Sequence, residues 1–183
     1  MRAVSKRQRE EVLRRISFRV LSWVMTVGFG LVAVGLIISL AYNLEGGPAS
    51  GVAACFFAIA LCRRLLGSRI VLGSSAVTVV NPLITYRVPY TAIGEVRGGK
   101  GGTLNLVTRT GDEIYSTGFG GSITDYFVGS TECAADRIEQ RVKARLKSRQ
   151  QVLVEKKFTV SWMADFCAEG AVVFVILAGV LGI

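Results

Sequence analysis

Residue types that could carry out chemistry are few in this 183-residue chain, and they do not gather at a recognisable spacing. The chain contains no histidine, which removes the usual general base near neutral pH and the commonest metal ligand. Ser74 and Ser75 could act as nucleophiles only beside a positioned base, and Asp112 and Glu113 lie at no spacing that would supply one. We therefore expect no enzymatic activity and no catalytic residue.

Neither a metal nor a cofactor is expected. The four cysteines form no Cys-x-x-Cys pair, so buried apolar thiols are favoured over a zinc site or a disulfide framework. The GGKGG segment at residues 98–102 lacks the Gly-Lys-Ser/Thr end of a P-loop and leads into no helix. GFGGS at residues 118–122 is typical of a strand exit. Both glycine motifs are therefore predicted to be loops.

Two carboxylates in an apolar segment are the residues that most suggest a site. Asp165 and Glu169 lie one helical turn apart in the stretch 158–183, whose uninterrupted apolar part begins at Gly170. Acidic residues inside a membrane span are costly and mark a partner contact or an ion pathway, whereas at headgroup depth they need no function. Headgroup placement is the favoured interpretation of Asp165 and Glu169, and a contact with a partner in the membrane is the candidate function. A proton or ion site is the remaining alternative.

The elements that would position these carboxylates are hydrophobic helices of membrane length. Residues 20–42 carry no charge and, at about 1.5 Å per residue, exceed the roughly 30 Å hydrocarbon core of a bilayer. Residues 48–62 form a second apolar run, which the following basic residues can extend by snorkelling. Together they predict a transmembrane helical hairpin over residues 20–66. Residues 158–183 predict a further hydrophobic helix that crosses the membrane.

Positive charge is concentrated beside these segments, and its position predicts their orientation. Residues 1–19 carry seven Lys/Arg and residues 132–157 carry eight, whereas the connection 43–47 carries none. By the positive-inside rule, the connection lies outside and both flanks lie in the cytoplasm, so we expect the chain in the inner (cytoplasmic) cell membrane. The competing interpretation is a signal peptide cleaved near residues 39–41, which would still leave the chain from residue 63 onward inside.

The basic flanks also supply candidate contacts for anionic lipid. Each Lys or Arg near an anionic bilayer surface contributes about 1 kcal/mol of attraction. We expect non-specific lipid contacts and no nucleic acid binding, because the charge flanks membrane segments and few aromatic residues alternate with it. The candidate lipid contacts are Arg14, Arg15, Arg63, Arg64, Arg141, Arg145, Lys156 and Lys157.

Between the second and third hydrophobic segments the periodicity changes to that of a β-rich domain. Six short β-branched or aromatic runs separated by turn residues predict an antiparallel sandwich or barrel. A helix over about residues 131–150 follows, with Ile138, Val142 and Leu146 on the face that would close one end of the strand layer. The six runs are RIVL (69–72), AVTVV (76–80), ITYRVPY (84–90), IGEV (93–96), TLNLVT (103–108) and EIYSTGF (113–119).

Part of this β-rich region carries a more specific pattern. It has an Asn81-Pro82 turn, an Arg87-Val88-Pro89 step followed by Tyr90, and Gly111 in a late hairpin. These features resemble the bacterial PH-like domains of small actinobacterial membrane proteins, including the low-molecular-weight protein antigen group, with Tyr90 in place of a more usual Trp. The resemblance covers residues 68 to about 125. It implies a PH-type bent sandwich capped by a C-terminal helix and preceded by two membrane helices, and the third hydrophobic segment departs from that pattern.

The sequence thus predicts an α+β membrane protein of four parts. The expected function is a non-enzymatic interaction or scaffold module at the cytoplasmic face, acting with a protein partner or with further copies of itself. The alternative is an accessory subunit of a larger membrane complex, such as a transport complex, that docks through its C-terminal helix. The four parts are a basic cytoplasmic segment (1–19), the helical hairpin (20–66), a PH-like domain (68–150) and the C-terminal hydrophobic helix (158–183).

Overall fold

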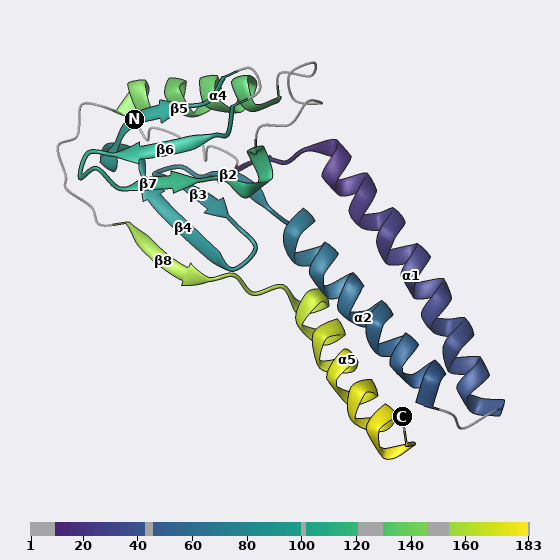
Figure 1. The fold of residues 1–183 in the computed structure, drawn as a ribbon. Coiled ribbons are helices and arrows are strands. Elements are labelled where there is room, and N and C mark those ends of the chain that lie inside the picture. Colours follow the sequence, from purple (N-terminus) through teal and green to yellow (C-terminus); the bar gives the residue numbers. More distant parts are fainter. Residues whose placement is uncertain (1–9, 43–45, 100–101, 121–129, 146–153, 183) are drawn as a thin grey trace, which may run out of the picture. The chain divides into compact units, whose positions relative to one another are not determined.

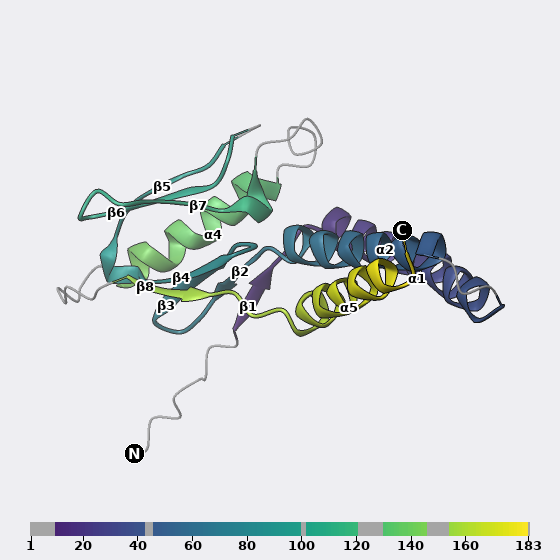
Figure 2. The same ribbon diagram turned by 60° about the horizontal axis from the view of Figure 1, so that its bottom comes forward.

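The computed structural model, drawn in Figures 1 and 2, describes residues 10–42, 46–99, 102–120, 130–145 and 154–182. The chain divides into two compact units. We call them the β-unit, which comprises Met1–Arg15 and Ser68–Thr159, and the helical unit, which comprises Ile16–Gly67 and Val160–Ile183. The fold is therefore α+β, and each unit is assembled from segments that are distant in the sequence.

The larger sheet of the β-unit has five antiparallel strands drawn from three parts of the chain. Their order is β1-β2-β3-β4-β8. The edge strand β1 precedes the three central strands in the sequence, and the other edge strand, β8, follows them. The register pairs Leu13 with Ile70 at one edge and Ile84 with Phe158 at the other. The strands are β1 (Glu11–Leu13), β2 (Arg69–Leu72), β3 (Ala76–Val80), β4 (Ile84–Pro89) and β8 (Glu155–Phe158).

The second sheet has three antiparallel strands in the order β5-β6-β7. Gly111 turns the chain between β6 and β7 at φ +91°, a conformation that favours glycine, and its N–H donates to the Thr108 carbonyl at 3.0 Å. Short 3-10 helices precede and follow the sheet. The elements are η1 (Tyr90–Ala92), β5 (Ile93–Arg97), β6 (Asn105–Thr108), β7 (Glu113–Tyr115) and η2 (Thr117–Phe119).

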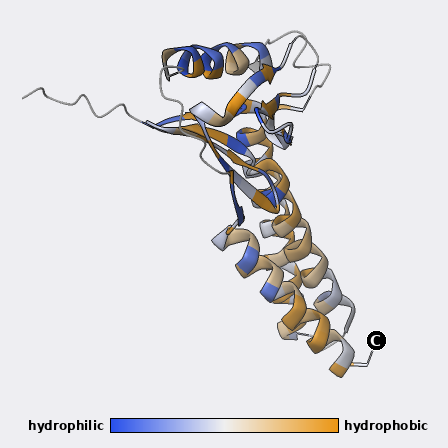
Figure 3. Ribbon diagram, turned by 90° about the vertical axis from the view of Figure 1, so that its left-hand side faces the viewer, coloured by the Kyte–Doolittle hydropathy of each residue, from blue (hydrophilic) through white to orange (hydrophobic). Residues whose placement is uncertain are grey.

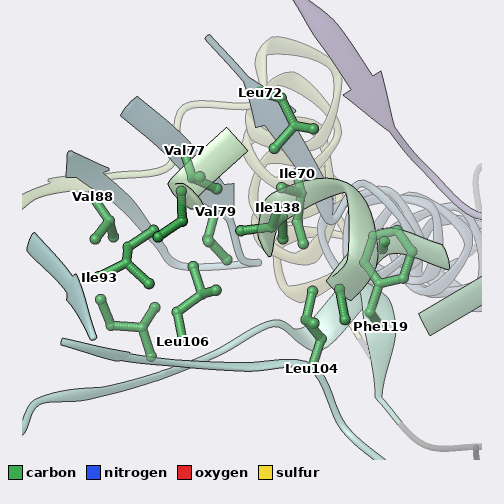
Figure 4. Close-up of a cluster of buried hydrophobic side chains, with 14 of the residues drawn as sticks. Ile70, Leu72, Val77, Val79, Val88, Ile93, Leu104, Leu106, Phe119 and Ile138 are labelled. Atoms are coloured by element: carbon green, nitrogen blue, oxygen red, sulfur yellow. The ribbon is translucent and has the colours of Figure 1, made fainter. Parts of the chain in front are cut away.

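Helix α4 (Ser130–Arg145) completes the core of the β-unit. Strand residues two apart share a face, so Val77 and Val79 of β3 both enter this core. From the second sheet, Leu106 of β6 and Leu104, which directly precedes β6, enter the same core. Figure 4 shows these side chains converging with Ile138 of α4. Fully burying one such side chain contributes about 1.5–3 kcal/mol, so the core that the two sheets and α4 share stabilises all three layers.

The predicted strands and the predicted basic helix are found where the sequence places them. The six runs correspond to β2 to β7, although the last run is a strand only over Glu113–Tyr115 and ends in η2 (Thr117–Phe119). The helix expected over 131–150 is α4, with Leu146 outside the described residues. The two sheets are separate and open, so the closed barrel that the sequence allowed is not formed. The strands β1 and β8 were not predicted, because neither alternates apolar and polar residues over a usual strand length.

The helical unit consists of three long helices, α1 (Ile16–Tyr42), α2 (Gly46–Leu66) and α5 (Trp162–Val180). All three are long and apolar enough to cross a membrane. Hydrophobic colours cover most of their length in Figure 3. Helix α2 packs against both α1 and α5. The predicted hairpin and the further hydrophobic helix are thus confirmed as helices of spanning length.

Small residues let the three helices approach one another. A Cβ atom added at Gly51 of α2 would lie 2.8 Å from Leu36 Cδ1 of α1, and one added at Gly170 of α5 would lie 2.8 Å from Phe56 Cδ2 of α2. The buried residues of α5 are the alanines Ala164, Ala171 and Ala178. Close backbone approach at small residues is how helices pack in lipid, where no hydrophobic effect drives them together.

Every chain connection between the two units leaves the larger sheet from the same end. The registers align the end of β1 with the start of β2, Arg69 with Val80, and Ile84 with Phe158. That end therefore holds the β3–β4 turn as well as the connections through residues 14–15, 67–68 and 159–161. Within the helical unit, α1 and α5 begin and α2 ends at one common end. Arg64 near the end of α2 pairs with Asp165 near the start of α5, and the neighbouring Arg63 lies over the ring of Trp23 near the start of α1.

Candidate functional site

The predicted membrane carboxylate Asp165 has a partner inside the helical unit. Arg64 Nη2 forms an ion pair with Asp165 Oδ1, and the backbone N–H of Ser161 donates to Asp165 Oδ2 at 3.2 Å. The two charged side chains are 32% and 34% exposed. A carboxylate in the first turn of a helix also complements the helix dipole. This geometry gives Asp165 and Arg64 a structural role, because together they fasten α5 to α2.

Glu169 has a different environment, although it lies only one turn further along α5. It is exposed, and no ion pair joins it to another residue in the described part of the chain. Large apolar side chains that also point away from the bundle lie near it in the sequence, including Phe166 and Val173. The structure thus separates the two carboxylates that the sequence analysis grouped, and only Glu169 faces outward with its charge available.

Arg63 joins α2 to the other neighbouring helix. Its guanidinium carbon lies 4.7 Å from the ring centroid of Trp23 on α1, within the range of a cation–π contact. Its Nε and Nη2 atoms are buried and make no hydrogen bond to any described residue. The adjacent arginines of α2 therefore reach opposite neighbours, with Arg63 on α1 and Arg64 on α5.

Several basic residues predicted to contact lipid bind within the β-unit. Arg15 is buried and donates from Nη2 to Thr131 Oγ1 at 3.5 Å. Arg141 donates to the carbonyl oxygens of Leu72 and Gly73 at 3.3 and 3.2 Å and pairs with Glu11 at 3.2 Å. Arg14 is half-buried, and the side chain of Arg145 lies outside the described residues. Arg15 and Arg141 therefore hold the N-terminal segment and the β2–β3 turn to α4.

Lys156 and Lys157 of β8 are the predicted lipid contacts that lie most open to solvent. All four residues of β8 are exposed, and the Lys157 side chain is 76% exposed. Lys157 Nζ lies 3.8 Å from Glu155, and Lys156 Nζ lies 5.8 Å from the Tyr86 ring centroid. Neither contact removes the ammonium group from solvent, so both charges are available to an anionic surface.

A polar network on the second sheet escaped the sequence analysis. Arg97 Nη2 lies 2.9 Å from Glu95 Oε2 and Nη1 lies 3.3 Å from Glu113 Oε1, while Glu113 Oε2 accepts from Asn105 and Tyr115. The hydrogen bond from Arg97 lowers the pKa of Glu95, and those from Tyr115 and Asn105 lower the pKa of Glu113. The Glu113 carboxylate in turn raises the pKa of Tyr115. The sequence signal that could have predicted this network is the spacing of Glu95 and Arg97 on β5 and of Glu113 and Tyr115 on β7, because strand residues two apart share a face.

The residues weighed for chemistry in the sequence have ordinary structural roles here. Asp112 Oδ2 accepts a hydrogen bond from Thr110 Oγ1 at 3.0 Å in the β6–β7 turn, and the Ser75 carbonyl accepts from the Tyr90 N–H at 3.2 Å. No three Cys, Asp or Glu side chains come together as a metal site within the described ranges. The cysteines of the described chain are unpaired, with Cys133 exposed on α4.

The features that most resemble a site are therefore surfaces. They are the outward apolar faces of the three helices, the outward-facing Glu169, and the exposed end of β8 with its lysines. Comparison of the chain with family models, with curated proteins and with solved structures gives no match.

Proposed function

We propose that this chain is a non-enzymatic interaction or scaffold module held in the bacterial cytoplasmic membrane, with its β-unit in the cytoplasm. The observation that carries this proposal is the outward exposure of large apolar side chains along three helices of membrane length. Such surfaces are stable in lipid and unfavourable in water. The β-unit of the same chain gathers most of its large apolar side chains in a core of its own, as a water-soluble domain does.

The distribution of charge supports this orientation. The opposite end of the helical unit carries no Lys or Arg in residues 43–47 or in residues 176–183. By the positive-inside rule, the basic end is the cytoplasmic one, and α5 then ends on the outer side. The basic residues within six positions of the start of α1 and α5 or the end of α2 are Arg14, Arg15, Arg19, Arg63, Arg64, Arg69, Lys156 and Lys157.

We also infer that the β-unit is a PH-like domain of the actinobacterial type that its sequence resembles. Two open antiparallel sheets sharing a core with one helix are compatible with a PH-type bent sandwich. Asn81 donates from Nδ2 to the Tyr115 carbonyl at 2.7 Å and accepts from the Thr117 N–H at 2.9 Å, so this turn links the two sheets. Buried Tyr90 donates its hydroxyl to the Gly73 carbonyl at 3.0 Å.

The direct test is to purify the tagged full-length protein from its native membrane in mild detergent and to identify bound proteins and lipids by mass spectrometry. The proposal predicts a protein partner, or further copies of the chain, at a fixed stoichiometry together with anionic lipid. Recovery of a single chain without an associated protein would contradict it.

A second candidate function, an accessory subunit of a membrane transport complex, is favoured by the outward carboxylate of Glu169. A charge on a lipid-facing helix surface is costly unless a partner supplies a basic or hydrogen-bonding group. Glu169→Gln should then release the complex while the bundle stays folded. Asp165→Asn is the matched variant, and it should weaken the α2–α5 contact through loss of the Arg64 ion pair. Normal assembly of Glu169→Gln would remove this candidate.

A further inference from the structure

A patch of large apolar side chains lies exposed at the end of the larger sheet that carries the chain connections. Leu83 is 58% exposed, Ile84 38% and Phe158 83%. Ile84 and Phe158 are direct cross-strand partners, and the Thr159 N–H donates to the Leu83 carbonyl at 2.9 Å. Cross-strand partners have their side chains on the same face of a sheet. We call these three residues the sheet-end patch.

The sheet-end patch continues the apolar face of the core beyond the point where the core ends. Along β4, Val88 is buried, Tyr86 is half-buried and Ile84 is exposed, and all three share one face. The second sheet and α4 contribute core residues around Val88, but the sheet-end patch does not belong to that core. Large apolar groups gathered on a surface mark a contact with another apolar phase.

The position of the sheet-end patch favours a lipid bilayer as the apolar phase that it contacts. The β3–β4 turn lies at the same end as the three connections to helices of membrane length, and these connections span only two, two and three residues. Three residues reach at most about 10 Å. A bilayer that holds the helices is therefore within reach of the patch.

The residues on either side of Phe158 suit the same interface. Lys156 and Lys157 precede it with exposed ammonium groups, and Trp162, which begins α5, is 86% exposed. Lysines attract anionic headgroups, and tryptophan is enriched at the boundary between headgroups and acyl chains. The order from Lys156 to Trp162 thus runs from basic to interfacial residues as the chain approaches the helix.

We propose that the sheet-end patch is a membrane-contact surface, with Leu83 and Phe158 lying at the headgroup–acyl boundary of an anionic bilayer. This inference rests on the proposed membrane anchoring and adds to it a contact made by the β-unit itself. The β-unit is then restrained at the bilayer by side chains as well as by its connections, so its opposite end is the one presented to a partner in the cytoplasm.

The test uses the full chain in nanodiscs of phosphatidylethanolamine and phosphatidylglycerol. In a cysteine-free background (Cys55→Ala, Cys62→Ala, Cys133→Ser, Cys167→Ala), Leu83→Cys receives an NBD fluorophore. Ser74→Cys, which replaces an exposed residue in the β2–β3 turn at the opposite end of the larger sheet, is the matched control. A lipid with a nitroxide on the fifth acyl carbon quenches groups buried about 5–10 Å into the headgroup boundary. We expect the label at position 83 to lose about half of its fluorescence, because residues inserted to this depth lie within reach of the nitroxide, and the label at 74 to lose almost none.

The native tryptophans separate failure of this inference from failure of membrane anchoring, because Trp23 and Trp162 both belong to the helical unit. Quenched tryptophan with an unquenched label at position 83 would overturn the inference and leave the anchoring intact. Unquenched tryptophan would overturn both. A label at 83 that stays unquenched in nanodiscs but is shielded from iodide in the native membrane would assign the sheet-end patch to a protein and would also overturn the inference.

Discussion

The β-unit and helix α5 of the helical unit bury side chains of different size. In the β-unit the most deeply buried residues are large, and they include Tyr90, Leu104 and Ile138. In the helical unit the buried residues of α5 are alanines, while large residues such as Phe166 and Ile176 are exposed. A chain that folds in water buries its large apolar groups, whereas helices in lipid gain nothing from doing so and instead pack through small residues. The contrast indicates two different solvents for one polypeptide.

The largest expected effect is the difference in stability between two single leucine-to-alanine variants, one in each unit. Leu106 is 1% exposed in the β-unit core, so Leu106→Ala should destabilise the β-unit by about 2–5 kcal/mol. Leu31 of α1 is 70% exposed, so Leu31→Ala should change the stability of the helical unit by less than about 0.5 kcal/mol. Hydrogen exchange of β6 and α1 amides in the full chain in nanodiscs measures both. Equal losses of stability in the two variants would contradict the proposed difference in packing between the two units.

The joint between the two sheets should show the next largest effect. Asn81→Ala removes the acceptor of the Thr117 N–H and the donor to the Tyr115 carbonyl, and should cost about 1–3 kcal/mol of β-unit stability. Asn81→Asp keeps the acceptor and loses only the donor, so its loss should be smaller. Urea unfolding of the full chain in micelles, monitored by hydrogen exchange of the β7 amides, ranks the stability of the original protein, Asn81→Ala and Asn81→Asp. An Asn81→Ala protein as stable as the original would show that the link is dispensable.

Glycine contacts in the helical unit give a smaller effect. Gly170→Ala places a methyl group 2.8 Å from the Phe56 ring, whereas Gly30→Ala in the interior of α1 meets nothing within 4 Å. Both positions lie inside a helix and gain the same helix propensity, so Gly170→Ala should be less stable than Gly30→Ala by about 1 kcal/mol, the lower end of the cost of overpacking. Unfolding in mixed micelles with increasing SDS compares them. Identical curves would mean that α5 does not pack on α2 through Gly170.

The smallest effect is a titration on the surface of the second sheet. The pKa of Glu113 is lowered by its hydrogen bonds from Tyr115 and Asn105, so the stability they contribute is present above pH 4.5 and is lost as the pH falls through the lowered pKa. The pKa of Tyr115 is raised, so its contribution is present below pH 10.0 and is lost as the pH rises through the raised pKa. Carbon-13 NMR of glutamate-labelled protein should show the pKa of Glu113 rising in Tyr115→Phe. An unchanged pKa would exclude the hydrogen bond as its cause.

Local patterns in the sequence were enough to predict the three long helices, the six central strands and α4. Each has an apolar period or a turn signal within a few residues. The strands β1 and β8 could not be predicted in this way, because EVL and EKKF are short edge segments ordered by partners far away in the chain, such as Leu72 for Glu11.

The candidate site was predicted less completely than the fold. Asp165 and Glu169 were singled out together from the sequence, but the difference between their environments depends on Arg64, which lies 101 residues from Asp165. Likewise, the roles of Arg15 and Arg141 depend on which surfaces α4 covers. A count of basic residues therefore describes the charge near a bilayer and cannot assign each arginine its partner.

The most direct test of the account is the sidedness of two thiols in sealed vesicles of known orientation. Cys133 is native and exposed on α4, and Gly47→Cys, placed in a Cys133→Ser background, is exposed near the start of α2. Cys133→Ser alone controls for the thiols of the helical unit. With a membrane-impermeant maleimide, we predict labelling of Cys133 only from the cytoplasmic side and of Gly47→Cys only from the outside. Labelling of both from one side would contradict a helical unit that spans the membrane below a cytoplasmic β-unit.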